Sequence, residues 1–131
     1  MEQFTIKTNS HAALIPITHQ IRSIVKKSQV SNGVCIIFCP HTTAGLTINE
    51  NADPDVAHDL LYMLDELIPW QDQGYRHGEG NSAAHLKASL MGSSVNVIID
   101  RGELQLGTWQ GIYLAEFDGP RTRKVFVKIV A

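Results

Sequence analysis

Alternating hydrophobic and polar side chains mark the expected strands of this chain. Apolar Phe4 and Ile6 alternate with polar neighbours in residues 2–9, and this period of two predicts a half-buried strand. The run "GVCIIFC" at residues 33–39 carries no polar side chain on either face, so we expect a central strand that is covered on both sides. Residues 46–49 alternate again and predict a short strand that leads away from this point.

Helical spacing of apolar residues predicts three helices. Their expected ranges are 17–28, 54–67 and 82–91. Asp53 followed by Pro54 is typical of an N-cap and a first helical turn, and Asn81 or Ser82 is expected to cap the third helix. The residues expected on the buried side of the third helix are Ala83, Leu86 and Leu90. Between the second and third helices, glycine-rich and polar residues predict a loop of about a dozen residues.

Three further alternating segments follow the last helix and are separated by turns that contain glycine. They are "SVNVIID", "TWQGIYLAEF" and "RKVFVKIV". Their consecutive order predicts an antiparallel meander at the end of the chain. We therefore expect an α+β fold with a large, mainly antiparallel sheet and about three helices packed on it. Neither glycine motif of nucleotide-binding proteins occurs, which argues against a doubly wound nucleotide fold.

The length and composition of the chain fit a single domain over residues 1–131. One hydrophobic core can serve 131 residues, and 44% hydrophobic against 18% charged residues argues against disorder. The net charge of -2 and the scattered basic residues lack the broad positive surface that is typical of nucleic-acid binding. A basic cluster at residues 121–124 could still hold a phosphate.

Features of membrane and secreted proteins are missing from the sequence. No stretch reaches the ~20 apolar residues of a membrane span, and the first residues lack the charged-then-apolar order of a signal peptide. We expect no membrane partner and a cytoplasmic location. Cys35 and Cys39 would lie ~13 Å apart in an extended strand, too far for a disulfide, and buried thiols agree with a reducing compartment.

The segment "HTTAGLTINENADP" at residues 41–54 concentrates polar chemistry directly after the expected central strand. His41 either projects from a rigid strand end into a crevice or only caps the strand end by a hydrogen bond. Asp53 is a simple N-cap or part of a site, since capping also fixes the position of its carboxylate. Asn49 and Glu50 lie just before the same helix, where exposed backbone N–H groups favour anions, and Glu50 has no capping role.

A second group of candidate residues lies in "HGEGNSAAHLK", residues 77–87. Glycines between His77 and His85 would let the loop histidine fold back over the helical one. His85 shares a helical stripe with Asn81, and this stripe carries too little charge for an ordinary solvated helix surface. Three histidines with a carboxylate could ligate zinc or a similar ion, although no C-x-x-C or H-E-x-x-H spacing supports a metal. The histidines expected on the surface are His11, His19 and His58.

The segment "GTWQGIYLAEF" places Gln110 and Glu116 on one strand face with aliphatic side chains. A carboxylate among aliphatic groups needs a partner or has a raised pKa, so Glu116 is a candidate site residue. In the alternative, Glu116 ends the strand and reaches water, with Arg121 or Arg123 as its ion-pair partner.

Three long segments carry a resemblance to a known family. They are "HTTAGLTINENADPDVAHDL", "YRHGEGNSAAHLKASLMG" and "LGTWQGIYLAEFDGPRTRKV". In this order they closely resemble the YjbQ family, small proteins often labelled secondary thiamine-phosphate synthase enzyme. The resemblance spans nearly the whole chain and implies an α+β fold assembled as a homotrimer. The site residues that it implies are His41, Thr42, Asn49, Glu50, Asp53, His77, Asn81, His85, Trp109 and Gln110.

The reaction implied by this resemblance joins a pyrimidine diphosphate to a thiazole phosphate and releases pyrophosphate. A divalent ion such as Zn²⁺ or Mg²⁺ would neutralise charge on the leaving group. Glu50 and Asp53 could hold this ion, and Arg121 or Arg123 could add positive charge if the trimer brings the hairpin close. The histidines that would bind phosphate, transfer protons or ligate the metal are His41, His77 and His85.

Two other functional classes remain open from the residues alone. Dedicated thiamine-phosphate synthases resemble one another as (β/α)8 barrels, a fold that typically needs ~250 residues, so this chain would need an unrelated site. A non-catalytic module that binds a metal or a phosphorylated small molecule is one alternative. A metal-assisted hydrolase that uses the same histidines is the other.

Overall fold

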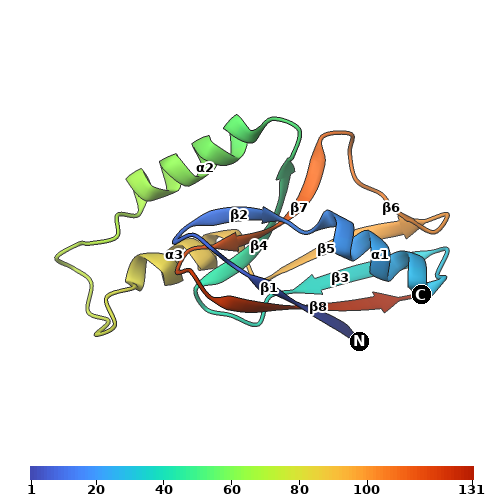
Figure 1. Ribbon diagram of the computed structural model, residues 1–131, viewed down its shortest axis with the longest axis horizontal. Helices are drawn as coiled ribbons and strands as arrows, with labels where there is room; N and C mark the ends of the chain where they lie inside the picture. Colours follow the sequence, from blue (N-terminus) through green and yellow to red (C-terminus); the bar gives the residue numbers. More distant parts are fainter.

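The computed structural model describes all residues 1–131, which form eight strands and three helices. The strands are β1 (Glu2–Lys7), β2 (Ala13–Pro16), β3 (Gly33–Phe38), β4 (Ala44–Glu50), β5 (Ser94–Asp100), β6 (Glu103–Leu104), β7 (Gln110–Glu116) and β8 (Thr122–Val130). The helices are α1 (Thr18–Ser28), α2 (Pro54–Leu67) and α3 (Ser82–Met91). Figure 1 shows both chain termini at the same end of the molecule. No helix is both long enough and apolar enough to cross a membrane.

Two antiparallel sheets form the body of the molecule. The larger has the strand order β1-β8-β3-β5-β6 and the smaller the order β2-β7-β4. Strand β3 is therefore the middle strand of the larger sheet, as its apolar sequence predicted. The α+β class, the antiparallel pairing and the three helices are confirmed.

The predicted meander at the end of the chain is wrong. Strand β5 pairs with β3 and β6, β8 pairs with β1 and β3, and β7 lies in the other sheet between β2 and β4. Period-two alternation shows which face of a strand is buried, but it does not show which neighbour the strand takes. The sequence analysis also missed β2 and β6, which are too short to display alternation.

The hydrophobic core lies between the two sheets and beneath α1. Ile21 and Val25 of α1 are buried in it together with inward-facing residues of β3 and β8. The main contributors from the strands are Cys35, Ile37, Leu46, Val97, Ile99, Ile112, Leu114, Val125 and Val127. Burial of this apolar area is the main stabilising contribution, at roughly 25 cal/mol per Å² removed from water.

The opposite face of the larger sheet carries an exposed apolar strip along β3, flanked by polar residues such as Asn96 and Lys128. The apolar residues of this strip, which we call the outer sheet face, are Val34, Ile36, Phe38, Ile98, Phe126 and Val130. Val34 and Phe38 of β3 are 39% and 42% exposed, and Ile98 of β5 is 64% exposed. The prediction that β3 is covered on both sides is therefore wrong for a single chain. A patch of this kind on a folded protein commonly marks an interaction surface.

Helix α3 lies on β4 with its small residues inward. Its buried positions are Ala83, Ala84, Lys87 and Ala88. Leu86 and Leu90, which were predicted to be buried, are 46% and 67% exposed. Close approach of the helix to the strand leaves room for alanine but not for leucine, and this explains the difference. The position of α3 matters because it carries His85.

Helix α2 stands at the edge of the molecule and has no fully buried residue (Figure 1, green). Its predicted start is confirmed, since the Asp53 carboxylate accepts a hydrogen bond from the backbone N–H of Asp55 at 2.9 Å and Pro54 occupies the first turn. The loop predicted between α2 and α3 is also present.

Candidate functional site

His41 lies just beyond the end of β3, where the chain turns toward β4. Strands β3 and β8 are antiparallel and pair as far as Phe38 opposite Phe126. Lys124 lies two residues before Phe126 in β8, beyond the end of β3. The backbone N–H of Lys124 donates to Nε2 of His41 at 2.8 Å. His41 therefore makes the strand-end hydrogen bond that the sequence offered as one interpretation, while its half-buried ring also borders a hollow.

His77 and His85 are in contact, as the glycines between them allow. Their rings are in edge-to-face contact, with centroids 5.2 Å apart and an angle of 86° between the planes. The loop turns back toward α3 at Gly80, whose φ of 75° is readily adopted only by glycine and whose backbone N–H donates to the His77 carbonyl at 3.1 Å. The glycines between the two histidines thus allow the expected fold-back.

Two adjoining hollows share His85. One, of about 450 Å³, is bordered by His41, Thr42, Ser89 and His85. The other, of about 500 Å³, is bordered by Tyr75, His77, Ser82 and His85. The structure therefore brings Thr42 and the three predicted histidines together around one side of α3. We call these residues the histidine cluster.

Glu50 does not join the histidine cluster within one chain. It ends β4, whereas His41 precedes the start of this strand, so about 20 Å separates the two ends at ~3.3 Å per residue. Glu50 pairs with Gln110 of β7, next to the exposed Asn49 and Trp109. We call these four residues the distal group. The convergence expected between Glu50 and the histidines is absent from a single chain because β4 is extended.

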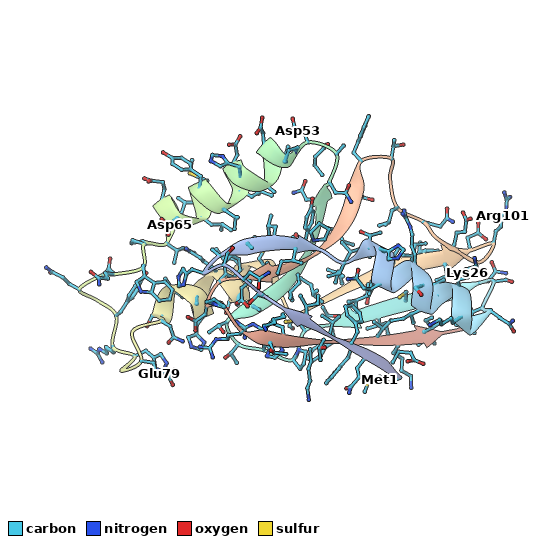
Figure 2. The ribbon with its side chains drawn as sticks, in the orientation of Figure 1. Met1, Lys26, Asp53, Asp65, Glu79 and Arg101 are labelled. Atoms are coloured by element: carbon cyan, nitrogen blue, oxygen red, sulfur yellow. The ribbon has the colours of Figure 1, made fainter.

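Asp53 also lies away from the histidine cluster. Figure 2 shows it at the start of α2, on the far side of the molecule from Glu79 in the loop that carries His77. The hydroxyl of Tyr113 donates to the Glu50 carbonyl at 2.8 Å and fixes the chain just before this helix. Asp53 acts here as an N-cap, and any catalytic role for it stays a prediction.

Asn81 and Arg121 meet at Asp118. The Asn81 amide donates to Asp118 Oδ2 at 2.9 Å, and Arg121 donates to the same oxygen at 2.9 Å. Asn81 occupies the N-cap position of α3 but makes no capping hydrogen bond, and its buried Oδ1 has no partner. Burial alone would raise the pKa of the Asp118 carboxyl, but the bonds from Asn81 and Arg121 lower this pKa below its ordinary value.

A buried ion pair lies between β7 and β8. Glu116 is fully buried and forms a two-pronged contact with Arg123, which is 4% exposed. Thr8 and the backbone N–H of Asp118 also donate to the carboxylate, and Arg123 donates to the Thr43 hydroxyl at 2.8 Å. Glu116 therefore takes an ion-pair partner, as the sequence allowed, but it does not reach water. Burial favours a raised pKa for Glu116, yet these hydrogen bonds keep the pKa below its ordinary value.

The same surroundings favour the neutral form of His41. Partial burial lowers the pKa of the imidazole, and the nearby positive charge of Arg123 lowers it further. A neutral ring is a weaker electrostatic partner for an anion than imidazolium, but it can still donate one N–H.

The residues of one chain do not fit a metal centre with three protein ligands. No group of three or more histidine, cysteine, aspartate or glutamate side chains is close enough to hold an ion together. Nε2 of His41 already accepts a hydrogen bond from Lys124, so it is not free to ligate. Within one chain, His77 and His85 are the only pair of predicted ligands in ring contact. The predicted metal role of the three histidines stays a prediction.

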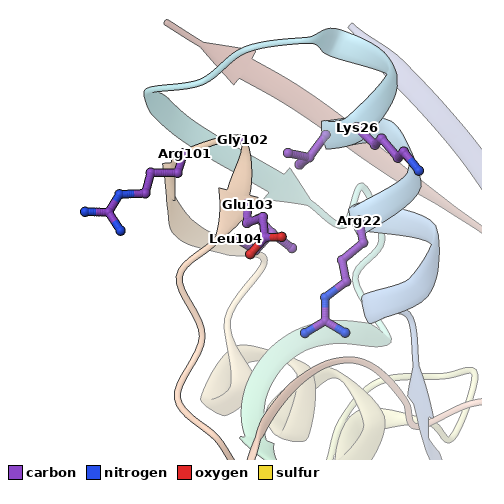
Figure 3. A pocket seen from close by; sticks show the side chains of 7 residues that line it. Arg22, Lys26, Arg101, Gly102, Glu103 and Leu104 are labelled. Carbon is purple, nitrogen blue, oxygen red and sulfur yellow. The ribbon is translucent and has the colours of Figure 1, made fainter.

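A further hollow is remote from these residues. It measures about 530 Å³ and lies between α1 and the turn that joins β5 to β6. Figure 3 shows that Arg101 and Lys26, on its rim, point away from each other, while Arg22 and Glu103 lie closer together. It contains none of the site residues that the sequence indicated, and its charged groups do not converge.

Comparison with known proteins matches nearly the whole length of the chain to one family. The family model "UPF0047 protein YjbQ-like" matches residues 2–131. The UPF0047 protein YugU of Bacillus subtilis is 49% identical over 130 residues, covering 99% of this chain and 98% of YugU. A UPF0047 protein of Methanocaldococcus jannaschii is 52% identical over 128 residues, covering 98% of this chain and 92% of that protein.

Solved structures of similar proteins have the same fold as this chain. The crystal structure of an uncharacterized conserved protein of the YjbQ/UPF0047 family from Clostridium acetobutylicum superposes with a TM-score of 0.97 at 57% identity, covering 99% of this chain and 100% of that one. A conserved hypothetical protein from Thermus thermophilus gives a TM-score of 0.92 at 42% identity, covering 99% of this chain and 100% of that one.

Proposed function

The chain belongs to the UPF0047 YjbQ-like family, and we propose that its histidine cluster binds a phosphorylated small molecule and acts on it as an enzyme. The specific reaction that we propose is thiamine-phosphate synthase-like transfer. The observation that carries the proposal is that His85 borders the hollow that contains His41 as well as the hollow that contains His77.

The chemistry of the cluster supports an anionic ligand. Imidazole N–H groups donate to phosphate oxygens, and such hydrogen bonds are strong when the acceptor is charged. Helix α3 begins beside His77, and the first backbone N–H groups of a helix favour anions. Ser82 at this helix start also borders the hollow that contains His77. These donors come from separate segments and line two adjoining hollows that share His85.

In the proposed transfer, the bond between the pyrimidine methylene carbon and the diphosphate oxygen breaks, and a bond from that carbon to the thiazole nitrogen forms. Pyrophosphate leaves with the electron pair of the broken bond. The histidine cluster would stabilise the negative charge that develops on this leaving group by donating hydrogen bonds. Because one chain lacks a three-ligand metal centre, we assign no step to a metal.

Assembly with further copies is part of the proposal. We propose a homotrimer in which the outer sheet face is covered by another copy, because its exposed apolar residues include Phe38 and Ile98. Such an assembly could also bring the distal group of one copy to the histidine cluster of the next. Glu50, Asn49, Gln110 and Trp109 would then contribute to a composite site. A cytoplasmic location is likewise proposed, in agreement with the two free cysteines.

The test separates ligand binding from catalysis. Inorganic pyrophosphate should raise the melting temperature of the purified protein, since a ligand that binds only the folded state stabilises it. The shift should be lost in His85→Ala and retained in His19→Ala, a matched control on the exposed face of α1. Synthase turnover should disappear in His41→Ala and in His85→Ala. Pyrophosphate binding without turnover would identify a binding module instead.

A metal-binding function is the second candidate, favoured by the ring contact between His77 and His85. Elemental analysis of the purified protein decides it. One ion per chain that disappears in His85→Ala, with folding intact, would support a metal-assisted reaction such as hydrolysis. Equal metal content in both proteins would exclude this candidate.

A further inference from the structure

The buried ion pair of Glu116 and Arg123 links β7 to β8 and also contacts the segment that carries His41. Nε and Nη2 of Arg123 contact both carboxylate oxygens of Glu116. Nη2 also donates to the hydroxyl of Thr43 at 2.8 Å and to its carbonyl at 3.3 Å. Thr43 lies two residues after His41, so the pair fixes the segment that carries this histidine.

The ring of His41 is held by the residue that follows Arg123 in β8. Lys124 follows Arg123 in β8, and its backbone N–H donates to Nε2 of His41 at 2.8 Å. Arg123 therefore binds the His41 segment with its side chain, while its neighbour binds the His41 ring through the backbone. Both contacts depend on the position of the start of β8, which the side-chain pair of Arg123 with Glu116 links to the end of β7.

This hydrogen bond determines which ring nitrogen carries the proton. A nitrogen that accepts a hydrogen bond cannot bear a proton, so neutral His41 must be protonated at Nδ1. Free imidazole side chains favour protonation at Nε2 in water. The tautomer of His41 is thus set by its surroundings.

A contribution to stability does not by itself account for this pair. Replacing a buried ion pair by well-packed apolar residues is often neutral or stabilising. The contacts of Arg123 with Thr43 serve the geometry of the His41 segment, which apolar side chains could not reproduce.

We propose that Glu116 and Arg123 are positioning residues that fix His41 as the Nδ1–H tautomer. In this form His41 is a hydrogen-bond donor to the hollow that it shares with His85. Only the donation to a ligand rests on the function proposed above; the tautomer and its dependence on the ion pair do not.

The test measures the tautomer directly, in folded protein without ligand. Two-bond ¹H–¹⁵N correlation spectra, recorded well above the ordinary histidine pKa of about 6.5, distinguish protonated from unprotonated ring nitrogens. The wild-type protein should show one tautomer at His41, protonated at Nδ1. The double variant Glu116→Leu with Arg123→Met should lose this preference and show a mixture that includes the Nε2–H form.

A matched control removes another buried cation. Lys87 is paired with Asp65 on the other side of α3, and Lys87→Met should leave the His41 tautomer unchanged. An Nε2–H tautomer in the wild-type protein would overturn the inference. An unchanged Nδ1–H tautomer in the folded double variant would overturn the positioning role. If the double variant does not fold, the tautomer is measured in Thr43→Val, which lacks the hydroxyl that links Arg123 to the His41 segment. An unchanged Nδ1–H tautomer in this variant would then overturn the positioning role.

Failure here is distinguishable from failure of the proposed function. Absence of pyrophosphate binding with the Nδ1–H tautomer intact would contradict the proposed ligand and leave the positioning role in place.

Discussion

Gly45 of β4 lies directly against the end of α3, where an added Cβ atom would come within 2.6 Å of the carbonyl oxygen of Gly92. The same atom would lie 3.0 Å from Cβ of Met91. The backbone N–H of Leu46 donates to the Gly92 carbonyl at 3.0 Å, so strand and helix end are joined at this point. Gly45 therefore sets how closely α3, and with it His85, approaches the sheet.

Substitution of this glycine should displace the helix. We expect Gly45→Ala to lower the free energy of unfolding by about 1–3 kcal/mol, because it overpacks a tight contact. Gly78→Ala is the matched control, since a Cβ atom there meets nothing within 4 Å. Urea denaturation of both variants measures the difference. Equal stability of the two would show that α3 does not approach β4 as closely as described.

The two ion pairs at the end of β7 should differ in their contribution to stability. Arg123→Met leaves the buried Glu116 carboxylate without its partner, which typically costs about 3–5 kcal/mol. Arg121→Met removes a partly exposed pair with Asp118, for which roughly 0–1 kcal/mol is expected. The comparison requires only chemical denaturation at neutral pH. Similar losses in the two variants would contradict the burial of the first pair.

The Glu116 carboxyl should make stability fall in acid. Its pKa in the folded protein is lower than in the unfolded chain, so its contribution is complete above the ordinary glutamate pKa of about 4.3. This contribution is lost as the pH falls from that value through the lower folded-state pKa. Glu116→Gln should therefore have a flatter stability profile below about pH 4.3 than the wild-type protein. Parallel profiles in thermal denaturation would show that Glu116 is not the group responsible.

Ligand affinity should follow the contact between the two clustered histidines. A hydrogen bond to a charged group contributes about 1.5–3 kcal/mol, so His77→Ala should weaken pyrophosphate binding roughly ten- to a hundredfold. His58→Ala is the control, because this exposed histidine lies on α2 next to Asp59. Isothermal titration calorimetry provides the dissociation constants. Unchanged affinity in His77→Ala would remove this residue from the proposed site.

The proposed assembly makes the outer sheet face sensitive to charge. Phe38→Lys should dissociate the assembly, because it would place an ammonium group in a buried apolar contact. Gln20→Lys, on the exposed face of α1, should leave the mass unchanged. Light scattering after gel filtration measures both. A wild-type protein that is monomeric at micromolar concentration would refute the assembly.

The sequence was informative where a single element decides the outcome. The Asp53 cap, the ranges of α1 and α2 and the central place of β3 all follow from local patterns, and the structure confirms them. The glycines between His77 and His85 showed only that the fold-back was possible, and the structure contains it.

Features that depend on distant partners could not be predicted. Strand β7 lies in the smaller sheet because it pairs with β2 and β4. The alternation of apolar and polar residues along a strand does not indicate which strands it pairs with. Lysine at position 87 gave no sign of burial, since its role depends on Asp65 of another helix. The hydrogen bond from Lys124 to His41 uses a backbone group, which no residue-type pattern can reveal.

The length of β4 has a consequence for mixed assemblies. If neighbouring copies meet head to tail in a closed ring, each junction joins the His85 end of one copy to the Glu50 end of the next. A copy with His85→Ala and a copy with Glu50→Ala would each be inactive alone. Mixed in one ring, they would still create a junction in which both residues are intact. Two defective proteins would thus restore part of each other's turnover.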